Sequence, residues 1–296
     1  MALIEETLLG TVDKVQIAIE RLKAFEPSDG YWIAFSGGKD SVVIKRLAQM
    51  AGVKFDAHYS VTSVDPPELV RFIKDVHPDV SFDIPRYKDG TAITMWNLIP
   101  KKLMPPSRLV RYCCASLKES NGMGHVVVTG VRWAESASRK NNKKLINIST
   151  KNGRNRVIFN DDNEESRRAV ELCYRTKKTM INPIIDWSDE DVWEFISTFK
   201  VKYCELYAKG YKRLGCIGCP MNTNADKELN AYPKQRMAYI RAFERMLGER
   251  KVKGLETSWT TGEKVMDWWL HGGSDNDELT LLDGYDDDDL TAVDAE

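Results

Sequence analysis

The stretch Ser36-Gly37-Gly38-Lys39-Asp40-Ser41 decides the fold, because it separates a predicted strand from a predicted helix. Residues 31–35 are apolar, aromatic and β-branched, which indicates a buried parallel strand. Residues 42–50 have the composition of a helix. The six residues therefore form a strand-to-helix turn, where glycines let a ligand approach the backbone and the helix N-terminus attracts phosphate.

This turn resembles the SGGxDS signature of the PP-loop pyrophosphatases, enzymes that split ATP between its α and β phosphates. It is not the G-x-x-x-x-G-K-S/T loop, because the first glycine is missing and the spacing is shorter. All six residues are predicted to contact a nucleotide: Ser36, Gly37, Gly38, Lys39, Asp40 and Ser41. Asp40 either holds a metal or caps the helix, and we favour capping. The simpler alternative is a glycine-rich turn capped by serine.

Composition and charge favour a globular protein with an anionic partner. Of 296 residues, 42% are hydrophobic and 29% are charged, and no apolar run approaches the roughly 18 residues of a bilayer span. The start has no basic-then-apolar signal pattern, so we expect a cytoplasmic protein. Residues 272–296 hold ten acidic and no basic side chains, which leaves residues 1–271 at about +9. That positive body favours nucleotides or nucleic acid, whereas the acidic tail is expected to be a disordered, solubilising end or a competitor of an anionic substrate.

Strand and helix patterns alternate after the turn, which predicts an α/β fold with a doubly wound, mostly parallel, Rossmann-like sheet. Ligands of such sheets bind beyond the carboxyl ends of the strands. Helices are expected at 3–25, after Pro67, at 91–99, after Ser188 with its Asp191 capping box, and after Pro233, and further strands at 55–59, 80–84 and 125–129. The expected domains are a nucleotide-binding part at 1–190, a helical part with the C-x-x-C at 191–271 and the acidic tail at 272–296.

Residues 139–178 interrupt this pattern with twelve Lys or Arg against five acidic residues. They are interpreted as a basic insertion, which is either a solvated loop or a surface for the phosphate backbone of a nucleic acid. Further along, Trp259, Trp268 and Trp269 are expected to pack in the interior or at an interface.

Six cysteines are present: Cys113, Cys114, Cys173, Cys204, Cys216 and Cys219. A disulfide framework is not expected in a cytoplasmic chain of this size. The adjacent pair at 113–114 and the C-x-x-C at 216–219 could together bind Zn²⁺ or an iron–sulfur cluster, although adjacent ligands are unusual for structural zinc. Spacing alone leaves a cluster, a zinc ion and a redox pair without metal equally open.

Together these motifs resemble the phosphoadenosine phosphosulfate (PAPS) reductase family of the adenine nucleotide α-hydrolase-like superfamily. The matching pieces lie between about residues 30 and 220: the turn at 36–41, Arg111-Tyr112-Cys113-Cys114 with Lys118, Thr129-Gly130-Val131-Arg132 with Arg139, residues 182–193, and residues 210–219. The resemblance implies a 4Fe–4S cluster on Cys113, Cys114, Cys216 and Cys219. It also implies nucleotide or anion contacts from Lys118, Gly130, Arg132 and Arg139.

Two departures from that family favour ATP as the substrate. No cysteine follows Cys219, so the thiol that family reductases carry in a C-terminal Glu-Cys-Gly-Leu-His segment is missing. The turn is also intact, as in relatives that use ATP. We therefore expect Mg²⁺-dependent α–β cleavage of ATP in sulfur transfer or nucleic-acid modification, with Lys39, Ser41, Arg132 and Cys204 as catalytic residues. The alternatives are a thiol-dependent reductase of adenylyl sulfate or phosphoadenylyl sulfate, and a non-catalytic binding module of a defence or modification complex. A homodimer or a complex subunit is expected.

Overall fold

The fold is taken from a computed structural model of the chain. It describes residues 3–7, 10–119, 121–136, 140–141, 144–149, 156–159, 166, 170, 178–255 and 257–272. The chain divides into two compact units: unit 1 comprises 1–59, 67–82 and 121–214, and unit 2 comprises 60–66, 83–120 and 215–296. The units alternate along the sequence, whereas the expected parts at 1–190, 191–271 and 272–296 are each continuous, because segments distant in sequence fold together.

Unit 1 is built on the expected mostly parallel sheet. Within the described residues the strand order is β5-β4-β3-β6-β9-β7-β8. The bounds are β3 Tyr31–Ala34, β4 Phe55–Ser60, β5 Ser81–Asp83, β6 Val126–Val128, β7 Ile146–Ser149, β8 Arg156–Phe159 and β9 Lys178–Ile181. Strand β3 pairs in parallel with β4 and β6, and β6 pairs in parallel with β9. The predicted α/β class is therefore confirmed, and the carboxyl ends of β3 and β6 lie side by side.

The basic insertion is more structured than expected where it is described. Strands β7 and β8 pair antiparallel, and β7 also pairs antiparallel with β9, so this hairpin extends the sheet. Ile146 and Ile148 are buried by that pairing, so a fully solvated loop is the wrong interpretation here. The proposed nucleic-acid contacts of the segment fall largely on residues outside the described ones, including Arg139.

The N-terminal prediction is half right. Residues 4–7 and 10–13 form a two-stranded hairpin, β1 Ile4–Thr7 and β2 Gly10–Asp13, in place of the expected helix. The helix α1 spans Lys14–Ala24 only, because the Asp13 side chain accepts hydrogen bonds from the first-turn amides and fixes its start. Val15, Ile19 and Leu22 are buried and form the apolar face of this helix.

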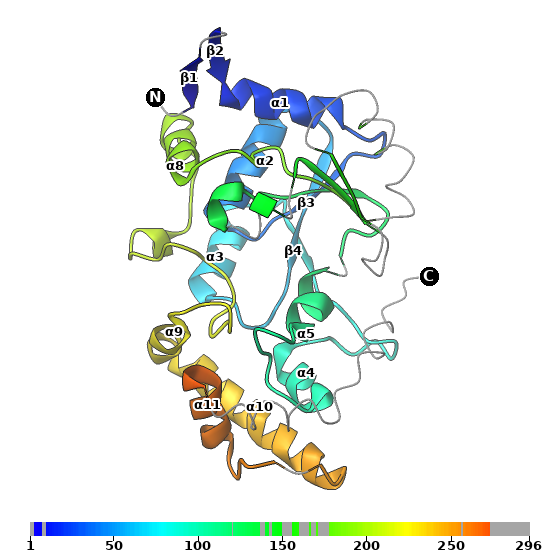
Figure 1. The fold of residues 1–296 in the computed structure, drawn as a ribbon, viewed down its shortest axis with the longest axis vertical. Coiled ribbons are helices and arrows are strands. Elements are labelled where there is room, and N and C mark those ends of the chain that lie inside the picture. Colours follow the sequence, from blue (N-terminus) through cyan, green and yellow to red (C-terminus); the bar gives the residue numbers. More distant parts are fainter. Residues whose placement is uncertain are drawn as a thin grey trace. The chain divides into compact units, whose positions relative to one another are not determined.

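Helices of unit 1 follow the strands as predicted (Figure 1). They are α2 Lys39–Ala51, α3 Pro67–Val76 and α8 Asp189–Thr198, with the 3-10 turns η2 Trp133–Glu135 and η3 Glu205–Tyr207. Helix α1 packs against α2. The predicted capping box of α8 is present, since Ser188 and Asp191 exchange side-chain to backbone hydrogen bonds.

Unit 2 is mostly helical around its own apolar core. Its elements are α4 Met95–Lys102, α5 Tyr112–Cys114, the π-helical turn η1 Ala115–Glu119, α9 Ala225–Ala231, α10 Pro233–Val252 and α11 Gly262–His271. Trp259 is buried in this core while Trp268 and Trp269 pack against it, which confirms a packing role for all three. Among the described residues, no helix is both long and apolar enough to cross a membrane.

Candidate nucleotide and cysteine sites

The turn between β3 and α2 requires glycine at position 37. Gly37 has φ of +73°, a left-handed conformation that other residues adopt only with strain. A Cβ at this position would lie 2.7 Å from Leu69 Cδ1 and 2.8 Å from Ile73 Cδ1. The backbone of the turn therefore lies directly against α3, at a distance that only glycine permits.

Hydroxyl groups organise the start of α2. Gly38 is the N-cap residue and has no side chain to cap the helix. The Ser41 hydroxyl donates to the Gly38 carbonyl at 2.9 Å, and Ser36 Oγ lies 3.4 Å from Ser41 Oγ. The Lys39 amide donates at 2.9 Å to the hydroxyl of Tyr207. Both serines thus hold the shape of the loop, and the Lys39 amide points away from the helix toward a side-chain oxygen.

Gly130 supports the loop from the neighbouring strand. It follows the end of β6, next to the end of β3 in the sheet. A Cβ on Gly130 would lie 2.8 Å from Asp40 Cβ and 3.0 Å from the Asp40 carbonyl carbon. The two backbones therefore meet without a side chain between them.

Four charged side chains form a neutral network beside the loop, which we call the loop quartet: Lys39, Asp40, Arg132 and Asp189. The Arg132 guanidinium donates to Asp40 at 2.7 Å and to Asp189 at 2.6 Å. The Lys39 ammonium lies 3.3 Å from Asp40 and 3.1 Å from Asp189. Arg132 is only 1% exposed, and it also donates to the Trp187 carbonyl at 3.2 Å.

Asp40 does not cap the helix. It lies inside the first turn of α2 and makes ion pairs with Arg132 and Lys39, which corrects the favoured interpretation of this residue. Partial burial favours the neutral form of Asp189, but hydrogen bonds from Arg132 and Lys39 outweigh it and lower the Asp189 pKa. Both carboxylates are therefore paired with Arg132 and Lys39, the two cations that were predicted to bind phosphate.

The four cysteines of the implied cluster all belong to unit 2. Cys113 and Cys114 lie where α5 passes into η1, and Cys216 and Cys219 flank Gly218, whose φ is +69°. Each of Cys114, Cys216 and Cys219 interacts electrostatically with Cys113. Among the described residues, no three Cys, His, Asp or Glu side chains are arranged to hold a single metal ion.

Positively charged side chains lie beside two of these thiols. A hydrogen bond from Cys113 lowers the Cys114 pKa to about 5, against the effect of burial and with help from Arg111, whose guanidinium lies 3.2 Å from Cys114 Sγ. Burial raises the Cys216 pKa to about 12, although Lys118 opposes this. Lys118 therefore lies beside Cys216 in unit 2, where it hydrogen-bonds to that thiol and interacts electrostatically with Asp65 and Cys114.

Cys204 is fully buried in unit 1 and is separate from that group. Burial raises its pKa, which is the reverse of an activated thiolate. Arg139 and Cys173 lie outside the described residues. Tyr207 was missed by sequence reasoning because it is 168 residues from Lys39 in the chain and belongs to no motif.

Comparison with known proteins places these sites in one family. Residues 30–222 match the phosphoadenosine phosphosulfate reductase domain family. The chain belongs to this family. The PAPS reductase domain thus contains the loop, the loop quartet and all four cysteines of unit 2, and it is an adenine nucleotide α-hydrolase-like domain.

Relatives of this PAPS reductase domain include two uncharacterized proteins of Methanocaldococcus jannaschii. They are 28% and 29% identical over 211 and 198 residues, which cover 68% and 64% of this chain but 44% and 35% of theirs. The chain therefore spans less than half the length of these relatives. An adenosine 5'-phosphosulfate reductase of Pseudomonas aeruginosa is 28% identical over 216 residues, 66% of this chain and 68% of the reductase. The crystal structure of a phosphoadenylyl-sulfate reductase from Candida auris aligns with a TM-score of 0.42 at 16% identity, covering 67% of this chain and 87% of that one.

Proposed function

We propose that the protein is an ATP-dependent adenylating enzyme that cleaves ATP between the α and β phosphates. The observation that carries the proposal is the intact loop, in which Gly37 lies against α3, Gly130 lies against Asp40, and the Lys39 amide at the N-terminus of α2 donates to an oxygen atom outside the helix. Hydroxyls of Ser36 and Ser41 hold this shape. An adenylate-binding loop of this kind suits pyrophosphate as a leaving group.

The loop quartet supplies the charge that the reaction needs. Asp189 is 63% exposed, so its carboxylate can turn to solvent and release Lys39 toward a phosphate. Arg132 stays buried and keeps Asp40 in place. An acceptor oxygen forms a bond to the α phosphorus, the bond to the α–β bridging oxygen breaks, and the acceptor proton passes to solvent. Lys39 and the loop amides stabilise the departing pyrophosphate, and Mg²⁺ arrives with ATP as part of the substrate.

Product analysis tests this proposal. We expect Mg²⁺ and ATP labelled at the α phosphate to give AMP or an adenylated acceptor with pyrophosphate when bulk tRNA or DNA is supplied. Lys39→Ala should lower the rate by at least about 100-fold, whereas Lys23→Ala, an exposed lysine of α1, should leave it unchanged. Formation of ADP and phosphate would contradict the proposal, and release of sulfite from adenylyl sulfate with a thiol would establish the reductase alternative.

We also propose that Cys113, Cys114, Cys216 and Cys219 hold a 4Fe–4S cluster. The donor set fits, because all four thiols lie in one unit, Cys113 interacts with the other three, and Arg111 and Lys118 lie beside them to balance thiolate charge. These four cysteines would hold the cluster through their thiolates. When bound, such a cluster supplies electron transfer or a binding site for inorganic sulfide.

Iron and sulfide counts after anaerobic purification test the cluster. We expect about four irons per chain in the wild type and a visible absorption band. Cys114→Ala should lose both, while Cys204→Ala, a cysteine outside this group, should keep both. Zinc in place of iron in the anaerobic protein, or equal iron in the two variants, would contradict the assignment.

The acceptor is proposed to be a nucleic acid, since residues 1–271 carry about +9 of charge. A cytoplasmic location and a homodimer or complex remain predictions.

A further inference from the structure

The hydroxyl of Tyr207 lies against the loop at residues 36–41, next to the backbone amide of Lys39. Its oxygen accepts the Lys39 amide hydrogen bond at 2.9 Å, and a Cβ added to Gly38 would lie 3.5 Å from the same oxygen. The loop thus directs an amide at the N-terminus of α2 toward an oxygen atom that comes from a segment after α8. Oxygen at that position is what a bound phosphate would provide.

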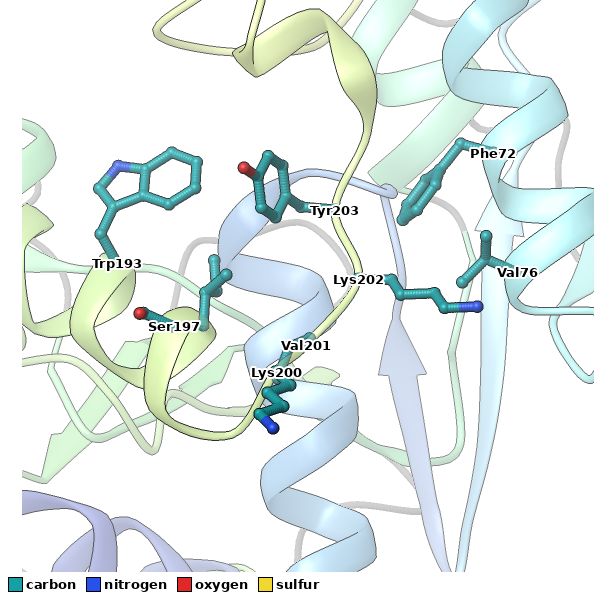
Figure 2. Close-up of a pocket in the computed structure, with 9 residues that line it drawn as sticks. Phe72, Val76, Trp193, Ser197, Lys200, Val201, Lys202 and Tyr203 are labelled. Carbon is teal, nitrogen blue, oxygen red and sulfur yellow. The ribbon is translucent and has the colours of Figure 1, made fainter.

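Aromatic rings hold Tyr207 in this place. Its ring lies edge-on to Trp193 of α8 with centroids 5.2 Å apart, and 6.3 Å from the ring of Tyr203. Trp193 and Tyr203 are also edge-on to each other, with ring centroids 5.3 Å apart. Both line an open groove of about 550 Å³ that Phe72, Lys200 and Lys202 complete (Figure 2). The rings that pack against Tyr207 therefore border an open groove.

We propose that Tyr207 competes with the nucleotide for the loop, and that a phosphate oxygen of ATP displaces its hydroxyl from the Lys39 amide. The inference rests on the proposed function and adds a residue to that site. A hydrogen bond to an anionic oxygen is roughly twice as strong as one to a neutral oxygen. Burial raises the pKa of Tyr207, so the phenol is neutral at physiological pH and loses to a phosphate. In the absence of nucleotide the hydroxyl keeps the amide hydrogen-bonded.

Removing one oxygen atom tests the competition. Tyr207→Phe keeps the ring and its packing but leaves the Lys39 amide free, so we expect ATP to bind about 2- to 10-fold more tightly, from the net value of one lost competing hydrogen bond. Tyr203→Phe removes a hydroxyl from the same aromatic group without touching the loop, and it should leave the Kd unchanged. Without nucleotide, hydrogen exchange of the peptide containing residues 36–41 should be faster in Tyr207→Phe alone, and ATP should slow it to the wild-type level.

The outcomes separate this inference from the proposed function. Tighter ATP binding with faster exchange in Tyr207→Phe supports the competition. Unchanged or weaker ATP binding in Tyr207→Phe, with normal binding by the wild type, overturns the inference and leaves the proposed function standing. Weaker binding would show that the hydroxyl contacts the bound nucleotide. If neither protein binds ATP or inorganic pyrophosphate, both the inference and the proposed function are overturned.

Discussion

The close packing around Gly130, and not its backbone conformation, requires glycine at this position. Its hydrogen faces Asp40, and an alanine Cβ there would lie 2.8 Å from Asp40 Cβ. We expect Gly130→Ala to lower the free energy of unfolding by about 1–3 kcal/mol, because the loop must shift, and to weaken ATP binding. Gly248→Ala is the matched control: nothing lies within 4 Å of its added Cβ in α10, so stability should rise by about 0.5–1 kcal/mol. Denaturant unfolding and calorimetric ATP titration measure both, and equal effects of the two substitutions would contradict the close approach.

Arg132 is expected to matter for stability as much as for chemistry. It is buried and is the common partner of Asp40 and Asp189. Arg132→Gln should cost about 3 kcal/mol, because a carboxylate loses its buried partner. The comparison is Arg21→Gln, which breaks a more exposed pair with Asp186 and should cost under about 1 kcal/mol. Urea unfolding of both variants checks the difference, and a cost for Arg132→Gln as small as that for Arg21→Gln would contradict it.

The sequence motifs identified several residues of the loop site, but not the residues with which they interact. Lys39, Ser41 and Arg132 were singled out from motifs, and they do lie at one place in unit 1. The partners of Lys39 and Arg132 were not foreseen, because a motif names residues but does not show which carboxylate reaches which cation. Tyr207 carried no signal at all, since only the folded chain brings it to Lys39.

Lys45 links helix α2 to the chain segment that follows α3 in unit 1. This buried lysine lies 2.6 Å from Asp79 and 3.3 Å from His77 Nδ1, just after α3. Burial and then the Lys45 ammonium lower the pKa of His77 from 6.5 to about 4. The Lys45 contact thus favours a neutral imidazole, and Asp79 only partly opposes this.

Stability should therefore depend on pH through His77. The folded state keeps its imidazole neutral, whereas the unfolded state binds a proton below pH 6.5. The contribution of the neutral His77 imidazole to the free energy of unfolding is complete above pH 6.5. It falls by about 2–3 kcal/mol as the pH drops toward 4. His77→Gln should flatten this part of the curve of unfolding free energy against pH. Parallel curves for the wild type and His77→Gln between pH 4 and 6.5 would contradict the prediction.

Elements were predicted well where one physical signal dominated. The loop strand, α2 and the Ser188 capping box have strong local patterns and were found. The N-terminal hairpin was missed because the helix expected at 3–25 was extended back past the Asp13 cap, where the structure has two short strands. Strand β7 was not predicted because many basic residues surround it in the sequence. Its apolar residues Ile146 and Ile148 nevertheless alternate with polar ones, as in a strand.

At the scale of the whole molecule, the two candidate sites belong to different compact units. The loop and its quartet are in unit 1, and the four clustered cysteines are in unit 2. The predicted parts at 1–190, 191–271 and 272–296 are continuous in sequence, whereas both compact units are built from several segments, because contacts join residues that are distant in the chain. The spacing of the two cysteine pairs left a cluster, a zinc ion and no metal open, and only the resemblance implied one group of four, whose members lie in unit 2 with Cys113 interacting electrostatically with the other three.

The distribution of charge over the whole chain should affect how it binds the proposed nucleic-acid acceptor. Residues 273–296, which lie outside the described residues, carry ten acidic side chains against a body of about +9. If this tail competes with nucleic acid for the body, a chain ending at residue 272 should bind single-stranded RNA or DNA more tightly at 50 mM salt. The gain should vanish near 300 mM, where screening shortens the reach of charges. Fluorescence anisotropy across a salt series measures this, with a full-length chain whose tail acids are replaced by Asn or Gln as the control for length. The same affinity for all three proteins at 50 mM would show that the tail serves solubility alone.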